Sequence, residues 1–240
     1  RVGKTRLVTE AVRGLADATV LRGRCLSYGE GITFWPLQEI VRSLSHRPAG
    51  APDPEEAQST EEIFWAYRKL FQGLSQERPL LILLEDIHWA EPTLLDLIEH
   101  VVEWTSDSRM LIVCLARPEL LDERSRWPGE RIELEPLAGE EADALLSGLG
   151  RPLEPEQRLR IAETAEGNPL FLEQLLALAA EEDGDEVVLP PTIHALLAAR
   201  LDRLDPEERS LLEAASVVGK EFWRGALLHL SPGEREVSVL

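Results

Sequence analysis

Gly3, Lys4 and Thr5 have the types and the order found at the end of a phosphate-binding loop, Gly-x-x-x-x-Gly-Lys-Ser/Thr. Apolar residues then recur at helical spacing, so the helix that must follow such a loop is predicted over Gly3–Leu15. In that setting Lys4 would reach the β- and γ-phosphates, and the Thr5 hydroxyl would ligate Mg²⁺. The tripeptide alone arises often by chance, and the leading glycine of the pattern falls before Arg1.

Glu85 and Asp86 directly follow the continuously apolar run Leu80–Leu84, which is typical of a strand buried on both faces of a parallel sheet. Two carboxylates at the end of such a strand are costly unless a cation or a polar network receives them. A metal-bound nucleotide offers one reason, since one acid can order Mg²⁺ while the other orients or deprotonates water. The alternative, also open, is that both acids cap a helix that begins near Pro92.

Arg117 follows almost directly on a further apolar segment, Met110–Leu115, which is predicted to be another buried strand. Ligands of doubly wound sheets lie beyond the carboxyl ends of the strands. The helix-opening loop, the acid pair and Arg117 are therefore expected to converge on one crevice, where Arg117 would sense a terminal phosphate. The plainer alternative is that Arg117 pairs with Glu119 or Asp122 on the surface.

Three other features have plain structural interpretations. The Gly167-Asn168-Pro169 segment ends one predicted helix and begins the next. His88 and Trp89 adjoin the acid pair and are interpreted as packing residues, with a place in the site wall as the alternative. Cys25 and Cys114 lack metal-ligand spacing and are interpreted as reduced thiols.

Strand and helix patterns alternate up to about Pro136, and only helical patterns follow. This alternation predicts an α/β doubly wound sheet. The predicted strands are Thr19–Cys25, Leu80–Leu84, Met110–Leu115 and Ile132–Leu134. The predicted helices are Gly3–Leu15, one entered at Pro36, Glu61–Leu74, one begun by Pro92, Gly139–Leu149, Pro155–Glu166, Pro169–Ala180, Pro191–Leu204 and Pro206–Val218. The best linker candidate is Asp183–Asp185.

The chain carries 44 acids against 25 bases, a formal net charge of −19 over 240 residues. Such a chain repels nucleic acid and anionic membrane surfaces, so neither is expected to bind this segment directly. No apolar run reaches the length of a membrane span, and a cytoplasmic location is expected. The composition otherwise suits a globular protein of one or two domains.

Taken in order, the segments resemble the nucleotide-binding module of STAND-class, AAA-related P-loop ATPases. VGKTRL is similar to the end of the Walker A motif, LLILLEDIHWAEPTLLDLI to the Walker B segment, LIVCLARPEL to the sensor-1 strand and EGNPLFLEQLL to the GxP-type lid motif. LPPTIHALLAARLDRLDPEERSLLEAASVVGKEF resembles the start of the family's winged-helix domain, and YGEGITFWPL resembles versions linked to class III nucleotide cyclases or LuxR-type regulators.

The resemblance implies three domains: an ASCE-type P-loop core in residues 1–136, a helical lid in 137–185, and an incomplete winged-helix-like domain in 186–240. It implies ATP or ADP with Mg²⁺ as cofactors. Gly3, Lys4 and Thr5 take the Walker A roles and Arg117 the sensor role. The remaining implied site residues are Glu85 and Asp86 as Walker B acids, which ligate the metal together with Thr5, and Gly167 and Pro169 as lid contacts near the base.

Two departures from the family pattern concern the site. Glu85 stands where the family commonly has Asp, which leaves open which acid orders Mg²⁺, and Arg1 stands where a middle glycine is frequent. The resemblance also implies that a strand preceding Arg1 belongs in the middle of the sheet, between the strands ending near Leu115 and Leu134. We therefore expect the 240-residue piece by itself to be poorly stable and to bind nucleotide weakly.

The favoured hypothesis is an ATP-binding, slowly hydrolysing switch within a larger signalling or transcription-regulating protein. Its expected partners are nucleotide, the effector and sensor domains of the same full-length chain, and possible self-association. Two alternatives remain open: a non-hydrolysing assembly scaffold and a P-loop phosphotransferase.

Overall fold

The computed structural model describes residues 3–26, 33–148, 154–181, 190–202, 204–218 and the single residue 225. These residues form two compact units, one spanning Gly3–Leu134 and the other beginning at Glu135. None of the helices in the described ranges is long and apolar enough to cross a membrane. Arg1 and the linker candidate Asp183–Asp185 lie outside the described residues.

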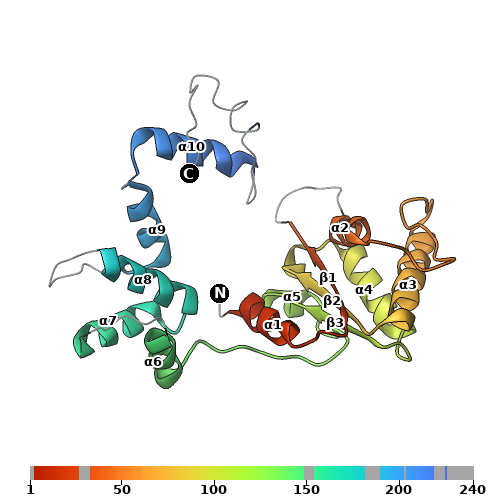
Figure 1. The fold of residues 1–240 in the computed structure, drawn as a ribbon, viewed down its shortest axis with the longest axis horizontal. Coiled ribbons are helices and arrows are strands. Elements are labelled where there is room, and N and C mark those ends of the chain that lie inside the picture. The colour runs from red at the N-terminus through yellow and green to blue at the C-terminus, as the bar shows by residue number, and fades with distance from the viewer. Residues whose placement is uncertain are drawn as a thin grey trace. The chain divides into compact units, whose positions relative to one another are not determined.

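Three parallel strands form the sheet of the first unit, in the order β1-β2-β3 (Figure 1). Their bounds are β1 Thr19–Arg24, β2 Leu80–Glu85 and β3 Met110–Cys114. The register sets Arg24 beside Glu85, and Leu84 beside Cys114. All three strands therefore end at the same edge of the sheet.

The middle strand, β2, feeds two separate cores. Leu80, Ile82 and Leu84 belong to the larger core, whereas Leu81 and Leu83 belong to a smaller one. Successive side chains of a strand point to opposite faces, so both faces of β2 are apolar and covered. All five residues are at most 4% exposed, which confirms the predicted doubly buried strand.

The helices of this unit are α1 Lys4–Arg13, α2 Trp35–Ser43, α3 Thr60–Glu77, the 3-10 turn η1 Ile87–Trp89, α4 Pro92–Trp104 and α5 Glu119–Glu123. Residues of α2, α3 and α4 fill the larger core, while Val8 and Val12 of α1 pack against the smaller one. Figure 1 shows α1 on one side of the sheet, with α3 and α4 on the other. The doubly wound arrangement is thus confirmed.

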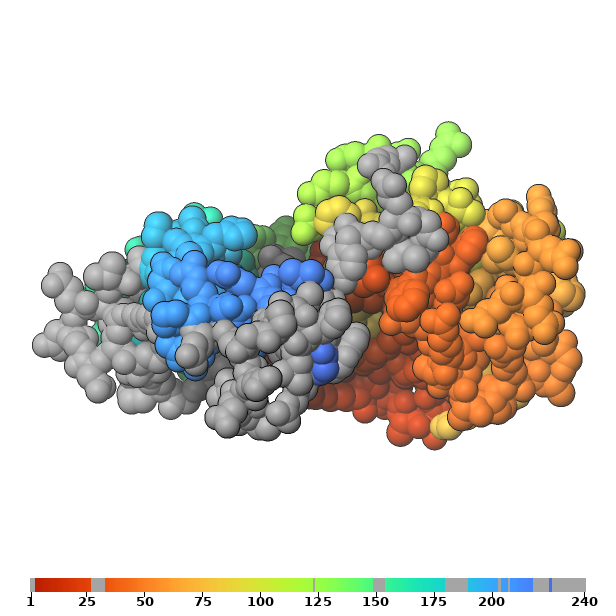
Figure 2. All heavy atoms as spheres, turned by 90° about the horizontal axis from the view of Figure 1, so that it is seen from above, coloured from red at the N-terminus to blue at the C-terminus, as the bar shows by residue number. Residues whose placement is uncertain are grey.

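Local sequence explains where several of these helices begin. Pro36 and Pro92 lie in the first turns of α2 and α4, where a residue without an N–H leaves no donor unpaired. Ser59 caps α3, since its hydroxyl accepts a hydrogen bond of 3.2 Å from the backbone N–H of Glu62. In Figure 2, the atoms of the stretch that runs from α2 through the following loop to α3 (orange) gather in one region of the surface.

Two predictions about the sheet are wrong. Ile132–Leu134 is not a strand, and Ile132 is 78% exposed, because this segment pairs with none of the three described strands. β3 is only partly buried rather than enclosed, because it lies at the edge of the described sheet. Leu111 accordingly is 57% exposed.

The second unit is helical in its described residues. It contains α6 Gly139–Gly148, α7 Pro155–Ala165, α8 Pro169–Glu181, α9 Ile193–Asp202 and α10 Pro206–Val218. Its core is built from α6, α7 and α8, and Leu196 of α9 lies in the same core with 0% exposure. α9 therefore packs with the core of α6, α7 and α8, and the predicted boundary between residues 185 and 186 lies outside the described residues.

Candidate functional site

The carboxyl ends of the three strands are joined at one level by backbone hydrogen bonds. Cys25 N–H donates to the carbonyl of Glu85 at 2.9 Å, and Leu115 N–H donates to the carbonyl of Leu84 at 2.8 Å. One residue beyond the acid pair, Ile87 N–H donates to the carbonyl of Leu115 at 3.1 Å. These bonds hold the ends of β1, β2 and β3 together where the sequence predicted a crevice.

Lys4 connects the start of α1 to the end of β3. Its ammonium group donates a hydrogen bond to the backbone carbonyl of Ala116, the residue before Arg117. Gly3 caps α1 in the left-handed region, with φ of 85°, a conformation that glycine adopts without a steric cost. Thr5 lies exposed in the first turn of α1. The helix-opening segment and Arg117 are thus brought together, as predicted.

The two acids have different surroundings. Asp86 adopts a left-handed conformation, with φ of 56°, and one of its carboxylate oxygens lies 2.5 Å from a guanidinium nitrogen of Arg24. Glu85 forms no ion pair with a cation among the described residues. Neither acid caps a helix through its side chain: Glu91 precedes α4, and Asp86 precedes η1 without such a bond. The capping alternative is therefore wrong.

Arg24 is a residue of this edge that the sequence interpretation missed. It ends β1, and the parallel register places it beside Glu85. The sequence feature that could have identified Arg24 as a site residue is its position near the end of the predicted strand Thr19–Cys25. The strand order was needed to show that its neighbours are the two acids.

Arg117 does not pair with Glu119 or Asp122 in the described structure. Its guanidinium lies over the indole of Trp89, with the central carbon 5.7 Å from the ring centroid. A cation over an indole face is attracted by the negative face of the ring and keeps its charge available to an anion. The surface ion pair proposed as the alternative for Arg117 is therefore wrong.

His88 lies on η1, directly after Ile87 and before Trp89. Both nitrogens of its ring are buried and lack a hydrogen-bond partner among the described residues. Burial lowers the pKa of His88, and the positive charges of Arg117 and Lys4 lower this pKa further, against the opposing effects of Asp86 and Glu119. The His88 ring also contacts the Trp89 ring, with the centroids 5.0 Å apart.

Gly167 and Pro169 belong to the second unit, and their role as nucleotide contacts stays a prediction. Gly167 has φ of 70°, and its carbonyl accepts a hydrogen bond of 2.9 Å from Leu137 N–H. The side chain of Asn168 accepts from Leu170 N–H at 3.1 Å, where α8 begins. These contacts form the turn between α7 and α8, as the plain structural interpretation predicted.

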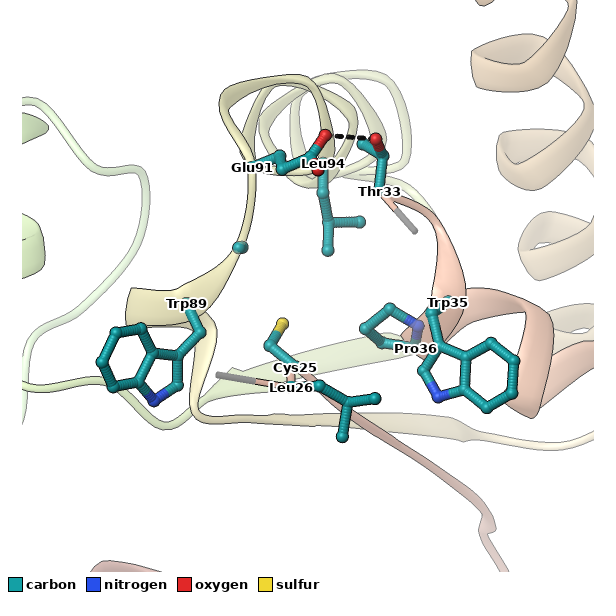
Figure 3. Close-up of a pocket in the computed structure, with 9 residues that line it drawn as sticks. Cys25, Leu26, Thr33, Trp35, Pro36, Trp89, Glu91 and Leu94 are labelled. Carbon is teal, nitrogen blue, oxygen red and sulfur yellow. Dashed lines mark hydrogen bonds between the residues drawn. The ribbon is translucent and has the colours of Figure 1, made fainter. Parts of the chain in front are cut away.

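A small pocket of about 30 Å³ lies beside the strand ends (Figure 3). Trp89 and Trp35 lie on opposite sides of it, and Cys25 lies between them. The Thr33 hydroxyl donates to the Glu91 carboxylate above (Figure 3). A space of this size suits about one water molecule rather than a nucleotide.

The side chains at the strand ends fit a magnesium-bound polyphosphate. Among the residues that the structure describes, neither Lys4 nor Arg117 forms an ion pair with a carboxylate, and Glu85 has no cation. Phosphate oxygens would complement the two cations. Mg²⁺ usually binds one or two carboxylates together with phosphates and waters, so Glu85 and Asp86 are a sufficient protein contribution.

Comparison with known proteins gives a partial match. The family model described as AAA ATPase domain matches residues 2–113, just under half of the chain. No curated protein matches. A Walker-type ATPase from Pyrococcus abyssi is similar in structure, with a TM-score of 0.52 and 14% identity over 96% of this chain and 81% of that one.

Two structures of RuvB variants from Thermotoga maritima also match, with 18% and 19% identity and TM-scores of 0.36 and 0.38; each alignment covers 97% of this chain and 81% of the other. The match over residues 2–113 and the fold shared with the Pyrococcus ATPase both include the segments that carry Lys4, Glu85 and Asp86. The first unit therefore has the α/β fold of P-loop NTPases, and these findings support a nucleotide-binding ATPase module.

Proposed function

We propose that this chain is an ATP-binding, slowly hydrolysing switch module of the STAND class, which works within a larger cytoplasmic signalling or transcription-regulating protein. The observation that carries the proposal is the contact between the Lys4 ammonium and the Ala116 carbonyl. It joins the helix-opening loop to the segment that bears Arg117. Two cations without a carboxylate partner in the described structure thus lie near Glu85 and Asp86 at the strand ends.

Each side chain has a role that follows from its chemistry. The backbone N–H groups at Gly3 and the Lys4 ammonium would hold phosphate oxygens. Thr5 and the two acids would hold Mg²⁺, with Glu85 as the principal carboxylate because Arg24 already neutralises Asp86. Bound ATP would supply a phosphoanhydride bond whose hydrolysis changes the charge presented to Arg117.

The regulatory role rests on the helical unit that follows the core. Gly167 and Pro169 would contact the nucleotide base from the lid, residues 137–185, and a winged-helix-like domain in 186–240 would pass the state of the lid to effector and sensor domains. A ligand shifts such an equilibrium only as far as its affinity differs between the two states. ATP and ADP differ by one phosphate, so Arg117 is the expected source of that difference.

One observation favours a non-hydrolysing scaffold as the second candidate. Arg24 occupies the carboxylate of Asp86, the acid that would otherwise be free to orient or deprotonate water. If this ion pair persists with nucleotide bound, Asp86 has no spare negative charge for general-base work. The scaffold would then bind ATP without turning it over.

The test is to measure ATP and ADP binding and ATP turnover, for the 240-residue chain and for a form extended upstream by a complete loop and strand. Lys4→Ala should weaken binding at least about tenfold, as expected for loss of a charged hydrogen bond. Lys69→Ala is the matched control, since Lys69 lies exposed on α3 of the same unit.

Lys4-dependent binding with turnover below about 1 s⁻¹ supports the switch. Lys4-dependent binding with no turnover supports the scaffold. Faster turnover points to an enzyme with a phosphate acceptor. Nucleotide binding that survives Lys4→Ala, or the absence of binding in both forms, contradicts the proposal.

A further inference from the structure

His88 lies next to the acid pair, and both hydrogen-bonding atoms of its side chain are unused in the described structure. Both ring nitrogens are buried, and neither has a partner among the described residues. Buried polar side-chain atoms in proteins nearly always have a partner, because an unmade hydrogen bond in a low-dielectric interior is costly. A pair of unpartnered nitrogens on one ring therefore calls for a ligand or an alternative position.

The backbone on either side of His88 is fixed. Ile87 N–H donates to the Leu115 carbonyl at 3.1 Å, and Trp89 N–H donates to the Asp86 carbonyl at 2.9 Å. The ring itself is held only by packing, against the Trp89 indole at 5.0 Å between centroids. Turning the imidazole toward the strand ends would therefore break no hydrogen bond of its own.

The charged groups around His88 indicate which kind of ligand its ring would contact at the strand ends. Arg117 and Lys4 are the cations that act on its ring, and Asp86 and Glu119 are the anions. Arg117 lies over Trp89, the residue whose ring contacts His88: its guanidinium carbon is 5.7 Å from the Trp89 ring centroid. An anionic oxygen between Lys4 and Arg117 would lie beside an imidazole that has a free N–H to donate.

His100 shows that burial near aromatic rings does not by itself create this situation. Its ring lies 5.5 Å from Phe64 and 6.0 Å from Trp104, measured between centroids, and burial also lowers the pKa of His100. In the described structure it carries no unpartnered buried nitrogen. His100 is therefore a matched comparison for His88 within the same unit.

We propose that His88 is a phosphate-contacting residue of this site: its imidazole turns toward the strand ends and donates a hydrogen bond to a phosphate oxygen bound between Lys4 and Arg117. The inference rests on the proposed function, because it requires a nucleotide or phosphate at that place. The hydrogen bond from His88 would form with ATP, which has the terminal phosphate, and would be missing with ADP. It also couples that contact to Trp89, whose ring contacts the His88 ring and lies under the Arg117 guanidinium.

The test titrates the 240-residue chain and its upstream-extended form with a non-hydrolysable ATP analogue, with ADP, and with inorganic phosphate alone or after ADP, all with Mg²⁺. Affinities are measured by calorimetry for the unsubstituted chain and for His88→Phe, His88→Gln and His100→Phe. The ring nitrogens are followed by ¹⁵N nuclear magnetic resonance, in which the His88 signals are those missing from His88→Phe. His88→Phe keeps the packing volume of the ring, and His88→Gln keeps an N–H donor.

His88→Phe should weaken binding of the ATP analogue roughly ten- to a hundredfold, the loss expected for one hydrogen bond to a charged group. ADP affinity should change by less than about threefold, since the contacted phosphate is absent. His88→Gln should recover part of the loss, and His100→Phe should have no effect. The ¹⁵N signals of His88 should shift with the ATP analogue.

A shift with ADP plus inorganic phosphate as well would show that any phosphate in this place is contacted. A shift with the ATP analogue alone would restrict the contact to the terminal phosphate of the nucleotide. Equal affinities in all variants, with unmoved ¹⁵N signals despite Lys4-dependent binding, would overturn the role of His88 and leave the proposed function standing. Absence of nucleotide and phosphate binding by the unsubstituted chain, in both the 240-residue and the upstream-extended form, would overturn both.

Discussion

The Arg24 guanidinium and the Asp86 carboxylate form an ion pair of 2.5 Å across the ends of the neighbouring strands β1 and β2. Both side chains are about one-third exposed, 35% for Arg24 and 31% for Asp86. Water therefore screens the pair, and its contribution to stability is modest, about 1 kcal/mol or less. Its larger consequence is that the two acids at the end of β2 are not equivalent: Asp86 is neutralised, and Glu85 is available to a metal ion.

Glu85→Gln should reduce the dependence of ATP affinity on Mg²⁺ more than Asp86→Asn does. Glu85 has no cationic partner in the described structure, so its charge is free for the metal, whereas Asp86 shares its charge with Arg24. The measurement is ATP binding with Mg²⁺ and with a chelator, and Glu10→Gln on the exposed face of α1 is the control. Equal losses from the two acid substitutions would contradict the assignment.

Gly23→Ala should destabilise the first unit by about 1–3 kcal/mol, the usual cost of overpacking. A Cβ at Gly23 would lie 2.4 Å from the carbonyl oxygen of Pro36, so the backbone of α2 would have to move away from β1. Urea unfolding monitors the change. Gly14→Ala is the matched control, because the nearest atom to its Cβ is 3.8 Å away; it should stay within about 1 kcal/mol of the unsubstituted chain.

Gly167→Ala should destabilise the helical unit by roughly 1–3 kcal/mol through strain and close contact. Gly167 has φ of 70°, and an added Cβ would lie 2.6 Å from the carbonyl oxygen of Leu137. Gly148→Ala at the end of α6, whose Cβ would meet nothing within 4 Å, is the control. Helicity measured during thermal unfolding reports the difference. An unchanged melting curve for Gly167→Ala would mean that the turn between α7 and α8 tolerates a side chain.

Cys25 and Cys114 should resist alkylation in the folded chain at pH 8. Burial, with a smaller effect from Asp86, raises the pKa of Cys25 to about 12, and burial raises the pKa of Cys114 to about 12 as well. The thiolate is the reactive form, so little of it exists at pH 8. Mass spectrometry after iodoacetamide treatment should show slow labelling that becomes fast in urea. Labelling of the folded chain at the rate of free glutathione would refute this.

His100 should make the chain less stable as the pH falls. Burial, followed by the charge of Arg68, lowers the pKa of His100 in the folded state, against the smaller effect of Glu103. The unfolded chain therefore takes up the proton first, and the free energy of unfolding declines as the pH falls through about 6.5, the ordinary value for histidine. Above that pH the effect is absent.

The pH effect of His100 is isolated by comparing the unsubstituted chain with His100→Phe in urea unfolding between pH 8 and pH 5. The phenylalanine keeps the ring packing against Phe64 and Trp104 and removes the titrating group. As the pH falls, the free energy of unfolding should decrease more for the unsubstituted chain than for His100→Phe. A difference that is independent of pH would show that burial of His100 has no such effect.

Short-range patterns in the sequence were enough for most elements and for the position of the acid pair. Leu80–Leu84 is apolar at every position, and a strand of this kind has to be covered on both faces, as β2 is. Pro36 and Pro92 start helices because their lack of an N–H is harmless only in a first turn. The order of Lys4, Glu85 and Arg117 after successive elements likewise predicted that they meet at one edge.

The tertiary structure decided what depends on neighbours far away in the sequence. Ile132–Leu134 has a strand-like composition but pairs with no described strand, and Leu111 is exposed because β3 lies at the edge. The ion pair of Arg24 with Asp86 follows from the pairing of β1 with β2, which no local pattern encodes. Helix and strand preferences arise from spacing along the chain, whereas partners are set by which elements pack side by side, and that choice belongs to the whole fold.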